Sequence, residues 1–293
     1  MNMQLSRIIA GTMKWGAWGA RFDTAAYEHM IRTCIEVGIT TFDHADIYGD
    51  YTTEAEFGAV LKQQPSLRQQ MQLITKCGIK KVSANRPLHQ IKSYDTSYNH
   101  IIESVETSLE QLHTDYVDVL LLHRPDILLN ADEVARAVAD LKQQGKILHF
   151  GVSNFRRWQV ELLRSRVAVE ANQVQCSILQ LDAFTDGTLD QCQQHRITPM
   201  AWSPMGGGNL FTEGEDERLQ RITAVAKLLA ARHGSRPDVV LLAWLLQHPS
   251  VIHPVLGTTR PERIRQAPEA LELRFTAEEW YMLWRASTGR EVA

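Results

Sequence analysis

The sequence lacks the features that mark secreted and membrane proteins. Its four cysteines show no paired spacing, which favours free thiols in a reducing compartment over a disulfide framework. The amino-terminal residues contain no charged stretch followed by an apolar core, so no signal peptide is expected. The longest apolar run covers residues 239–246, far short of the roughly 20 residues that a membrane span needs. These absences predict a cytoplasmic protein that does not associate with membranes.

The chain also lacks a strong excess of charge of either sign. Its formal net charge is -3, and no basic stripe or acidic tail is present, so a nucleic-acid partner is not expected. The 293 residues are 44% hydrophobic, enough for one large core or two modest ones. No linker rich in proline, glycine or serine divides the chain. We therefore expect one domain, residues 1–293.

Motifs of several common enzyme classes are missing. No Gly-x-Gly-x-x-Gly and no Walker-type Gly-x-x-x-x-Gly-Lys-Ser/Thr occurs, which argues against a dinucleotide-binding Rossmann domain and a P-loop. A metal-dependent barrel hydrolase would need clustered ligands such as His-x-His, and none is present. No metal site is expected.

What the chain does contain is a regular alternation of strand-like and helix-like segments. Residues 97–113 place apolar side chains at helical spacing, and residues 117–123 form a near-continuous apolar strand of the kind buried on both faces. Strands are predicted at 7–11, 39–43, 73–76, 117–123, 147–152, 171–176, 198–202 and 251–256, with helices at 23–37, 53–62, 97–113, 132–144, 156–164, 189–195, 219–233, 239–247 and 262–271. About eight strand–helix units in this length predict a closed (β/α)₈ barrel rather than an open doubly wound sheet. One extra carboxyl-terminal helix, at 277–286, would lie outside the repeat.

Four polar side chains lie at or just beyond the ends of predicted strands. Asp43, Lys76 and His123 each end a strand, and Tyr48 lies in the loop after Asp43. The carboxyl ends of barrel strands form the face that carries active sites. We expect the four side chains to meet at this rim.

Their combined chemistry suits a carbonyl group. A free phenol has a pKa of about 10, too high for an efficient acid at neutral pH, but a neighbouring Lys76 would lower the pKa of Tyr48. Asp43 would hold the ammonium in place, and a neutral His123 would orient the carbonyl oxygen. None of these side chains can deliver a hydride, so the arrangement requires a cofactor. Taken singly, each is more often a solvated charge or a loop or core residue than a catalytic group, and spacing alone names no reaction.

Several motifs together resemble the aldo-keto reductase family. They are Gly11-Thr12-Met13, Asp43 to Tyr48-Gly49, Lys76 after Ile74-Thr75, Leu122-His123, Gly151-Val152-Ser153-Asn154-Phe155 and Trp202-Ser203-Pro204-Met205-Gly206. They occur in the family's order over nearly the whole chain. The stretches 43–48 and 123–126 are most similar to a bacterial branch of oxidoreductases labelled YdhF.

The resemblance implies a TIM barrel that binds NADPH across its carboxyl-terminal face and reduces aldehydes and ketones without a metal. By it, Tyr48 donates the proton, Lys76 and Asp43 tune Tyr48, and His123 orients the carbonyl. The implied cofactor contacts are Gly11, Thr12, Met13, Ser153, Asn154, Gln173, Trp202, Ser203, Pro204, Met205, Gly206, Gly257, Thr258, Thr259, Arg263 and Gln266.

Three parts of the cofactor would be held by different groups. Ser153, Asn154 and Gln173 match positions that bind the nicotinamide carboxamide, and Trp202 replaces a tyrosine that usually stacks on the ring. Arg263 matches the stretch that holds the 2′-phosphate, which suits the forked donors of arginine. Residues 264–267 depart from the usual Glu-Asn ending. That departure leaves the adenine contacts and the strength of the NADP preference open.

Other expectations concern the pocket and its surroundings. Trp15, Trp18 and Tyr51 are expected to face the substrate, whereas His44, where the family commonly has threonine, should have a structural role. Cys77 is read as a small buried residue rather than a reactive thiol. The long connections 77–96 and 203–216 are equally consistent with pocket walls and with tolerated insertions.

Two further expectations concern the oligomeric state and the function. A monomer is expected because the family is often monomeric. The rival to a reductase is a cofactor-binding regulatory or redox-sensing subunit with little turnover.

Overall fold

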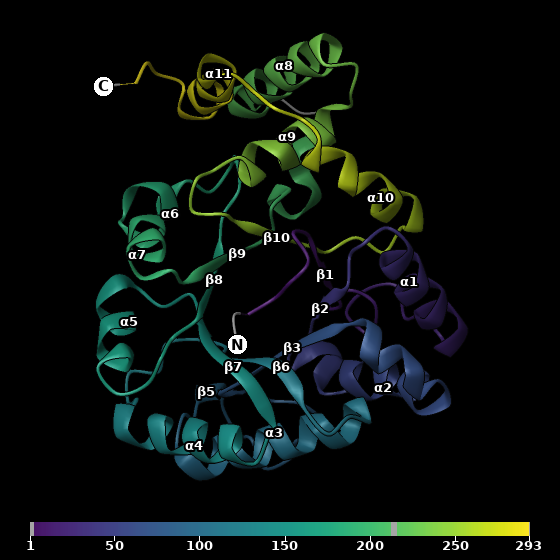
Figure 1. The fold of residues 1–293 in the computed structure, drawn as a ribbon, viewed down its shortest axis with the longest axis vertical. Helices are drawn as coiled ribbons and strands as arrows, with labels where there is room; N and C mark the ends of the chain where they lie inside the picture. The colour runs from purple at the N-terminus through teal and green to yellow at the C-terminus, as the bar shows by residue number, and fades with distance from the viewer. Residues whose placement is uncertain (1–2, 212–215, 293) are drawn as a thin grey trace.

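Parallel strands closed into a barrel form the centre of the structure, a computed structural model that describes residues 3–211 and 216–292 (Figure 1). Around the barrel the order is β1-β10-β9-β8-β7-β6-β3-β2. The strands are β1 (Ile9–Gly11), β2 (Thr41–Asp43), β3 (Gln72–Cys77), β6 (Val117–Leu122), β7 (Ile147–Ser153), β8 (Ala171–Gln175), β9 (Thr198–Trp202) and β10 (His253–Leu256). The predicted (β/α)₈ fold class is confirmed.

Each barrel strand is followed by a helix that packs on the outside of the barrel (Figure 1). These helices are α1 (Thr24–Glu36), α2 (Thr53–Gln63), α3 (Tyr98–Leu112), α4 (Ala131–Gln143), α5 (Arg157–Arg164), α7 (Thr188–His195), α9 (Pro237–Leu246) and α10 (Pro261–Gln266). Shorter elements are η1 (Tyr48–Asp50), η2 (Pro65–Gln70), α6 (Asp182–Thr185), η3 (Gly206–Phe211) and η4 (Ala267–Leu271). The helix predicted at 262–271 is divided into α10 and η4 because Pro268 lacks the N–H that would continue it.

Two helices, α8 (Glu217–Arg232) and α11 (Ala277–Thr288), lie side by side outside the ring (Figure 1). The predicted terminal helix is confirmed, but the sequence did not indicate that α8 would join it. Trp280 of α11 stacks on Trp244 of α9 with ring centroids 4.7 Å apart. Each indole N–H donates to the backbone oxygen of the other tryptophan, at 3.1 and 3.0 Å. This reciprocal pair attaches the outer helices to the barrel.

The interior of the barrel is closed at the amino-terminal ends of its strands. Apolar side chains from β1, β3, β6, β8, β9 and β10 fill it, and Met3 and Leu5 pack against this cluster from the segment that precedes β1. Figure 1 shows that segment running into the middle of the ring. The opposite, carboxyl-terminal end is therefore the one available for a site.

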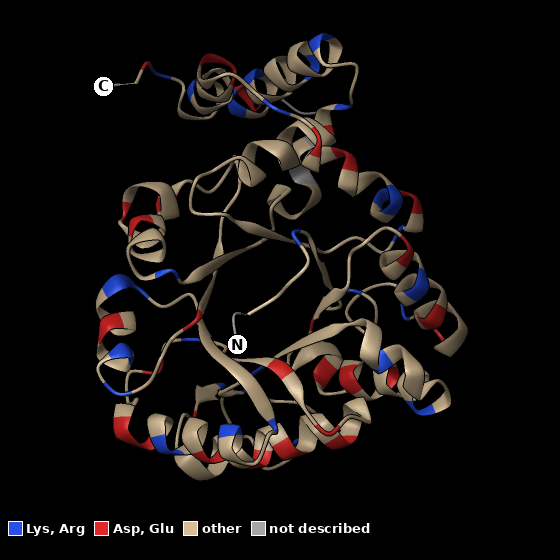
Figure 2. Ribbon diagram, viewed as in Figure 1, with Lys and Arg blue, Asp and Glu red and all other residues tan. Residues whose placement is uncertain are grey.

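The outer surface mixes both signs of charge. Figure 2 shows lysine and arginine interspersed with aspartate and glutamate on the helices around the ring. Among the described residues no helix is both long and apolar enough to cross a membrane.

The two long connections follow β3 and β9. In residues 77–96 the short strands β4 (Ile79–Lys80) and β5 (Ser93–Tyr94) pair antiparallel, and the loop between them exposes Leu88 and Ile91. The connection 203–216 contains η3, and its residues 212–215 lie outside the described part of the chain.

A close helix contact depends on Gly58 in α2. A Cβ there would lie 1.9 Å from the backbone oxygen of Gln111 and 2.9 Å from the Cα of Leu112. We expect Gly58→Ala to lower the free energy of unfolding by roughly 1–3 kcal/mol, because overpacking outweighs the gain of up to about 1 kcal/mol from better helix propensity. Urea unfolding measures the change. Gly257→Ala is the matched control, since a Cβ at Gly257 meets no atom within 4 Å; equal stabilities of the two variants would contradict the prediction.

Candidate active site

Lys76 is the centre of the predicted cluster. Its side chain is fully buried, and its Nζ donates to Asp43 Oδ2 at 2.8 Å, to the backbone oxygen of His44 at 2.7 Å and to Tyr48 Oη at 3.0 Å. An ammonium has three protons and no acceptor, so all three protons are used. The structure thus brings together the acid, the lysine and the phenol that the sequence placed at strand ends.

Strand register and a tight loop create this geometry. Strands β2 and β3 are parallel neighbours with Asp43 opposite Ile74, which leaves Lys76 two residues further toward the carboxyl-terminal rim. The chain beyond β2 then turns back through η1, where Gly49 and Tyr51 have φ values of 60° and 72°. The turn before η1 is closed by the Tyr48 backbone N–H, which donates to the Ala45 oxygen at 3.1 Å, and the left-handed residues lead the chain from Tyr48 toward α2.

Burial and neighbouring charges together determine the pKa values of Lys76 and Tyr48. It acts to lower the pKa of Lys76, but attraction to Asp43 and Tyr48 outweighs it and leaves that pKa raised. Burial also raises the pKa of Tyr48, and the nearby Lys76 ammonium offsets only part of the rise. The sequence-based expectation of a lowered phenol pKa is therefore wrong for the net value. Because Lys76 can only donate, the Tyr48 proton stays on the phenol and is free to bond elsewhere.

His123 faces Tyr48 from the neighbouring strand end. The ring centroids are 5.9 Å apart at an interplanar angle of 80°, and the His123 backbone N–H donates to the oxygen of Cys77 at 2.9 Å. Burial, followed by the charges of Lys76 and Arg124, lowers the pKa of His123 well below its usual value. The imidazole is therefore neutral and can donate one hydrogen bond.

Residues predicted to hold the nicotinamide end form one chain of hydrogen bonds. Gln173 Nε2 donates to Asp43 Oδ1 at 2.8 Å, and its backbone oxygen accepts from Ser153 Oγ at 2.9 Å. Asn154 Nδ2 donates to Ser153 Oγ at 2.8 Å, and Trp202 Nε1 donates to Asn154 Oδ1 at 3.0 Å. These amide and hydroxyl groups have the donors and acceptors that a carboxamide needs, and they lie beside a partly exposed indole.

The predicted contacts at β1 and β10 have different surroundings. A Cβ on Gly11 would lie 3.1 Å from the backbone oxygen of Leu256, so the two strand ends approach closely. Thr12 is buried, and its Oγ1 lies 3.0 Å both from the backbone oxygen of Asp43 and from His44 Nδ1. Its hydroxyl is thus engaged within the protein, whereas the side chain of Met13 is exposed.

The remaining predicted contacts lie along the rim and on α10. Ser203 has a φ of 51° directly after β9, where it begins the turn formed by Pro204, Met205 and Gly206. Of the second group, which is Gly257, Thr258, Thr259, Arg263 and Gln266, the side chain of Arg263 is exposed and makes no ion pair within the described residues. The structure places all of them beyond the ends of β9 and β10.

Of the three residues expected to face the substrate, Trp15 does not. It is fully buried against Phe42 and Phe57, and its Nε1 donates to the backbone oxygen of Thr258 at 3.2 Å. That prediction is wrong because the chain after β1 folds back into the layer between barrel and helices.

Trp18 and Tyr51 do lie beside the tetrad formed by Asp43, Tyr48, Lys76 and His123. The Trp18 ring is 6.1 Å from that of Tyr48, and its Nε1 donates to Asp50 Oδ2 at 3.2 Å. Tyr51 Oη accepts from the backbone N–H of Lys81 at 2.8 Å, and both rings belong to one apolar cluster with Tyr48. Their roles toward a substrate remain predictions.

His44 has a structural environment. Its ring packs edge-on against Phe57 at 4.5 Å, and Nδ1 lies 3.0 Å from Thr12 Oγ1. Burial, and secondarily the charge of Lys76, lowers the pKa of His44 to about 3.

Sequence reasoning missed one residue at the site, Arg124. It follows His123 directly, and its Nη1 donates to the His123 backbone oxygen at 3.0 Å and to Ser153 Oγ at 3.4 Å. Its position immediately after a strand end was the available signal.

The four cysteines are free and buried. Burial raises the pKa of Cys34, Cys176 and Cys192 to about 12 and raises that of Cys77 well above its usual value. Cys77 is therefore an inert buried thiol, in agreement with the sequence analysis.

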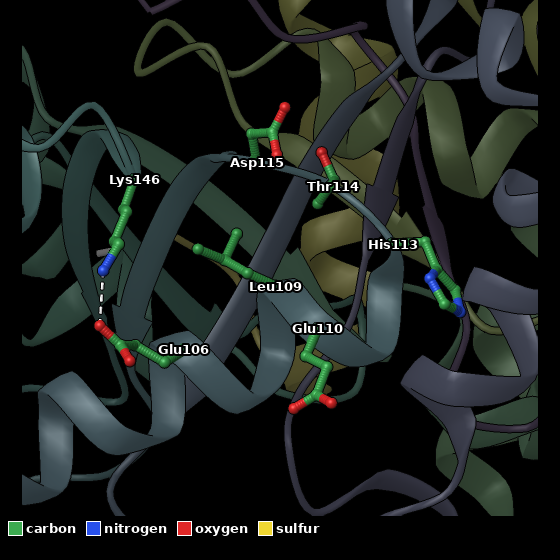
Figure 3. Close-up of a pocket in the computed structure, with 7 residues that line it drawn as sticks. All are labelled: Glu106, Leu109, Glu110, His113, Thr114, Asp115 and Lys146. Atoms are coloured by element: carbon green, nitrogen blue, oxygen red, sulfur yellow. Dashed lines mark hydrogen bonds and ion pairs between the residues drawn. The ribbon is translucent and has the colours of Figure 1, made fainter.

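A hollow of about 530 Å³ lies elsewhere on the molecule (Figure 3). Its lining residues are Glu106, Leu109, Glu110, His113, Thr114, Asp115 and Lys146. They come from the end of α3 and from the segments that enter β6 and β7. The hollow is thus at the amino-terminal ends of the strands, opposite the tetrad. Within the described chain no group of three or more His, Cys, Asp or Glu side chains could hold a metal ion.

The family model for the aldo/keto reductase family matches residues 7–287. The chain belongs to this family. The oxidoreductase YdhF of Escherichia coli is 43% identical over 295 residues, which cover 99% of this chain and 96% of that protein. A protein named 6-dehydroglucose reductase from Agrobacterium fabrum is 42% identical over 294 residues, which cover 100% of this chain and 97% of its own.

A solved structure of the thermostable aldo-keto reductase Tm1743 has a TM-score of 0.78 and 28% identity, covering 96% of this chain and 95% of the other. Aldo-keto reductases use nicotinamide cofactors and act on small carbonyl compounds. This member is an NAD(P)H-dependent oxidoreductase.

The buried, neutral His44 makes a pH-dependent contribution to stability. Its folded pKa is about 3 and its unfolded pKa about 6.5, so below pH 6.5 the unfolded chain binds a proton that the folded chain does not. The free energy of unfolding therefore falls as pH falls, by about 1.4 kcal/mol per unit from this group.

Replacing the imidazole removes that proton. Relative to His44→Asn, the wild type should lose about 2 kcal/mol of unfolding free energy between pH 7 and pH 5, measured by urea unfolding at each pH. Gln63→Asn, an exposed position without a titratable group at the end of α2, is the control that should leave the pH dependence unchanged. Parallel pH profiles for wild type and His44→Asn would refute the assignment.

Proposed function

We propose that this aldo-keto reductase is an NADPH-dependent enzyme that reduces the carbonyl group of an aldehyde or ketone, with Tyr48 as proton donor and without a metal. The observation that carries the proposal is the position of Lys76. Its ammonium bonds at the same time to Asp43 and to Tyr48 Oη.

The protein's part in the reaction follows from these contacts. A carbonyl oxygen bound between the Tyr48 hydroxyl and the neutral His123 ring receives two hydrogen bonds, which polarise the carbon. A nicotinamide cofactor bound at the rim would supply the hydride for that carbon. As charge develops on the oxygen, Tyr48 transfers its proton, and the resulting phenolate lies beside the Lys76 ammonium, while Asp43 keeps that ammonium charged and in place.

The cofactor would lie across the carboxyl-terminal rim. Ser153, Asn154 and Gln173 would bind its carboxamide, and the face of Trp202 would stack on the nicotinamide ring. Arg263 would bind the 2′-phosphate of NADPH, because its exposed guanidinium makes no ion pair within the described residues. The other contacts would be the rim residues Gly11, Thr12, Met13, Ser203, Pro204, Met205, Gly206, Gly257, Thr258, Thr259 and Gln266.

The rival function, a regulatory or redox-sensing subunit, fits the site less well. All four thiols are buried with raised pKa values, which disfavours thiol-based sensing. The bonds from Lys76 to both Asp43 and Tyr48 suit proton transfer instead. We further propose that the enzyme is a single-domain monomer of the cytoplasm. Light scattering, which gives the molar mass in solution, tests the monomer. The name of the Agrobacterium relative makes 6-dehydroglucose a carbonyl to include in any substrate panel.

Removing the Tyr48 hydroxyl tests the proton donor. Tyr48→Phe should lower kcat by about 100- to 10,000-fold, the usual contribution of a positioned acid, and should leave the Kd for NADPH within about 2-fold, because the ring remains. NADPH oxidation with an activated aromatic aldehyde and fluorescence titration measure the two quantities. Tyr98→Phe removes a hydroxyl of α3 that donates to Asp140 of α4, away from the site, and should change neither kcat nor the Kd. A parallel loss of cofactor affinity and turnover in Tyr48→Phe would count against Tyr48 as the acid.

Arg263 tests the cofactor preference. Arg263→Ala should weaken NADPH binding by about 10- to 100-fold, since a hydrogen bond to a charged group is worth about 1.5–3 kcal/mol, and should change NADH binding much less. Fluorescence titration with both cofactors measures the ratio. Arg232→Ala, on α8 outside the ring, is the control. A constant ratio would place the phosphate elsewhere.

A further inference from the structure

Arg124 is a half-buried cation at the rim of the site that the proposed reaction leaves without a role. It follows β6 directly, next to His123. Burial lowers its pKa, and Tyr48 and Tyr94 oppose the shift. Among the described residues no carboxylate lies within ion-pair distance of its guanidinium. A partly desolvated cation without a counter-ion is costly, so an acceptor from outside the chain would stabilise it.

Two nitrogens of this guanidinium, Nε and Nη2, have no acceptor in the described chain and share one edge. Of its three nitrogens only Nη1 has acceptors, the His123 backbone oxygen and Ser153 Oγ. Within the described chain Nε and Nη2 donate to nothing. The nearest carboxylate in sequence, Asp126, instead accepts from Thr96 Oγ1 at 3.0 Å and from the backbone N–H of Leu128 at 2.9 Å. Nε and Nη2 together form the fork that binds a carboxylate by two parallel hydrogen bonds.

The guanidinium lies close to the groups of the proposed reaction. The guanidinium is 5.8 Å from the centroid of the Trp202 ring and 3.4 Å from Ser153 Oγ. Its charge lowers the pKa of both Tyr48 and His123. Arg124 therefore lies among β6, β7 and β9 on the same face as the tetrad.

A second cation acts on the same space. Lys92, in the loop between β4 and β5, is exposed, and its charge also contributes to the lowered pKa of His123. Lys76 is neutralised by the buried Asp43, whereas neither Arg124 nor Lys92 has an acidic partner within the described residues. These two cations can attract anions to the site.

We propose that Arg124 binds a carboxylate of the substrate through its Nε and Nη2 edge, so that the preferred carbonyl compounds are aldehydes or ketones that carry a carboxylate. The planar carboxylate matches the planar fork, and Lys92 adds longer-range attraction at the mouth. The inference rests on the proposed reductase function, because it assumes that the carbonyl is bound at Tyr48 and His123.

A pair of substrates with the same ring and the same aldehyde tests it. The ratio of kcat/KM for 4-carboxybenzaldehyde to that for methyl 4-formylbenzoate is measured with NADPH, because the ester differs mainly in charge. Arg124→Gln should lower this ratio by about 10- to 100-fold, the range for hydrogen bonds to a charged group. Arg124→Lys should restore part of the ratio, since it returns the charge without the fork.

A matched control removes the same charge elsewhere. Arg157, on α5, lies over the ring of Trp158 at 5.1 Å, a similar cation–aromatic contact on the outer surface. Arg157→Gln should leave the ratio unchanged. A ratio that is equal in wild type and Arg124→Gln would overturn the inference. So would an equal loss for both substrates together with weaker NADPH binding, because that result would assign Arg124 to the cofactor.

Binding without turnover keeps the two proposals separable. Calorimetry with the NADPH-loaded protein compares 4-(hydroxymethyl)benzoate with its methyl ester, because an alcohol cannot react with the reduced cofactor. The wild type should bind the carboxylate at least about 10-fold more tightly, a preference lost in Arg124→Gln. If this preference is present while no aldehyde is turned over, the carboxylate site stands and the reductase proposal fails. If both aldehydes are reduced at equal efficiency and calorimetry shows no preference for the carboxylate, the reductase proposal stands and the carboxylate site fails.

Discussion

The buried ammonium of Lys76 is the constraint on which the site depends. A charge removed from water must be paired and hydrogen-bonded, or its burial becomes unfavourable by several kcal/mol. Here Asp43, the backbone oxygen of His44 and Tyr48 Oη supply that environment. Lys76 therefore has all its partners only when β2 keeps its register against β3 and the segment after β2 keeps its turn. The contacts that stabilise this part of the barrel are the same contacts that would position the proton donor.

Asp43 links this cluster to the opposite side of the rim. Its Oδ2 accepts from Lys76, and its Oδ1 accepts from Gln173, 130 residues further along the chain. Gln173 in turn connects to Ser153, Asn154 and Trp202. A carboxamide bound by Gln173 would compete for the amide that now bonds Asp43. Cofactor binding and the electrostatics of the tetrad are therefore coupled through one carboxylate, and a change at Gln173 should alter both.

The barrel and the tetrad could be predicted from the sequence because both depend on local patterns. Apolar runs that end in Asp43, Lys76 or His123 can be recognised without tertiary information. Trp15 could not be placed in this way, since its burial depends on Phe42 and Phe57, which come from other elements. The pKa of Tyr48 is raised by burial and lowered in part by Lys76, and the sequence indicated only the effect of Lys76. Arg124 was visible beside His123, but its free edge is defined by contacts that its neighbours make elsewhere.

The charges around the tetrad also suggest how a substrate would influence its own reduction. Lys76 and Arg124 both act to lower the pKa of Tyr48, and Asp43 opposes them. A carboxylate bound to Arg124 would cancel part of this positive influence, so that the pKa of Tyr48 would rise further before hydride transfer. The phenol would then hold its proton more firmly in the ground state. The Lys76 ammonium, already bonded to the phenol oxygen, would still stabilise the phenolate that forms as the proton leaves. Charge recognition at Arg124 would thus act against proton donation by Tyr48, and the Lys76 ammonium would limit that loss.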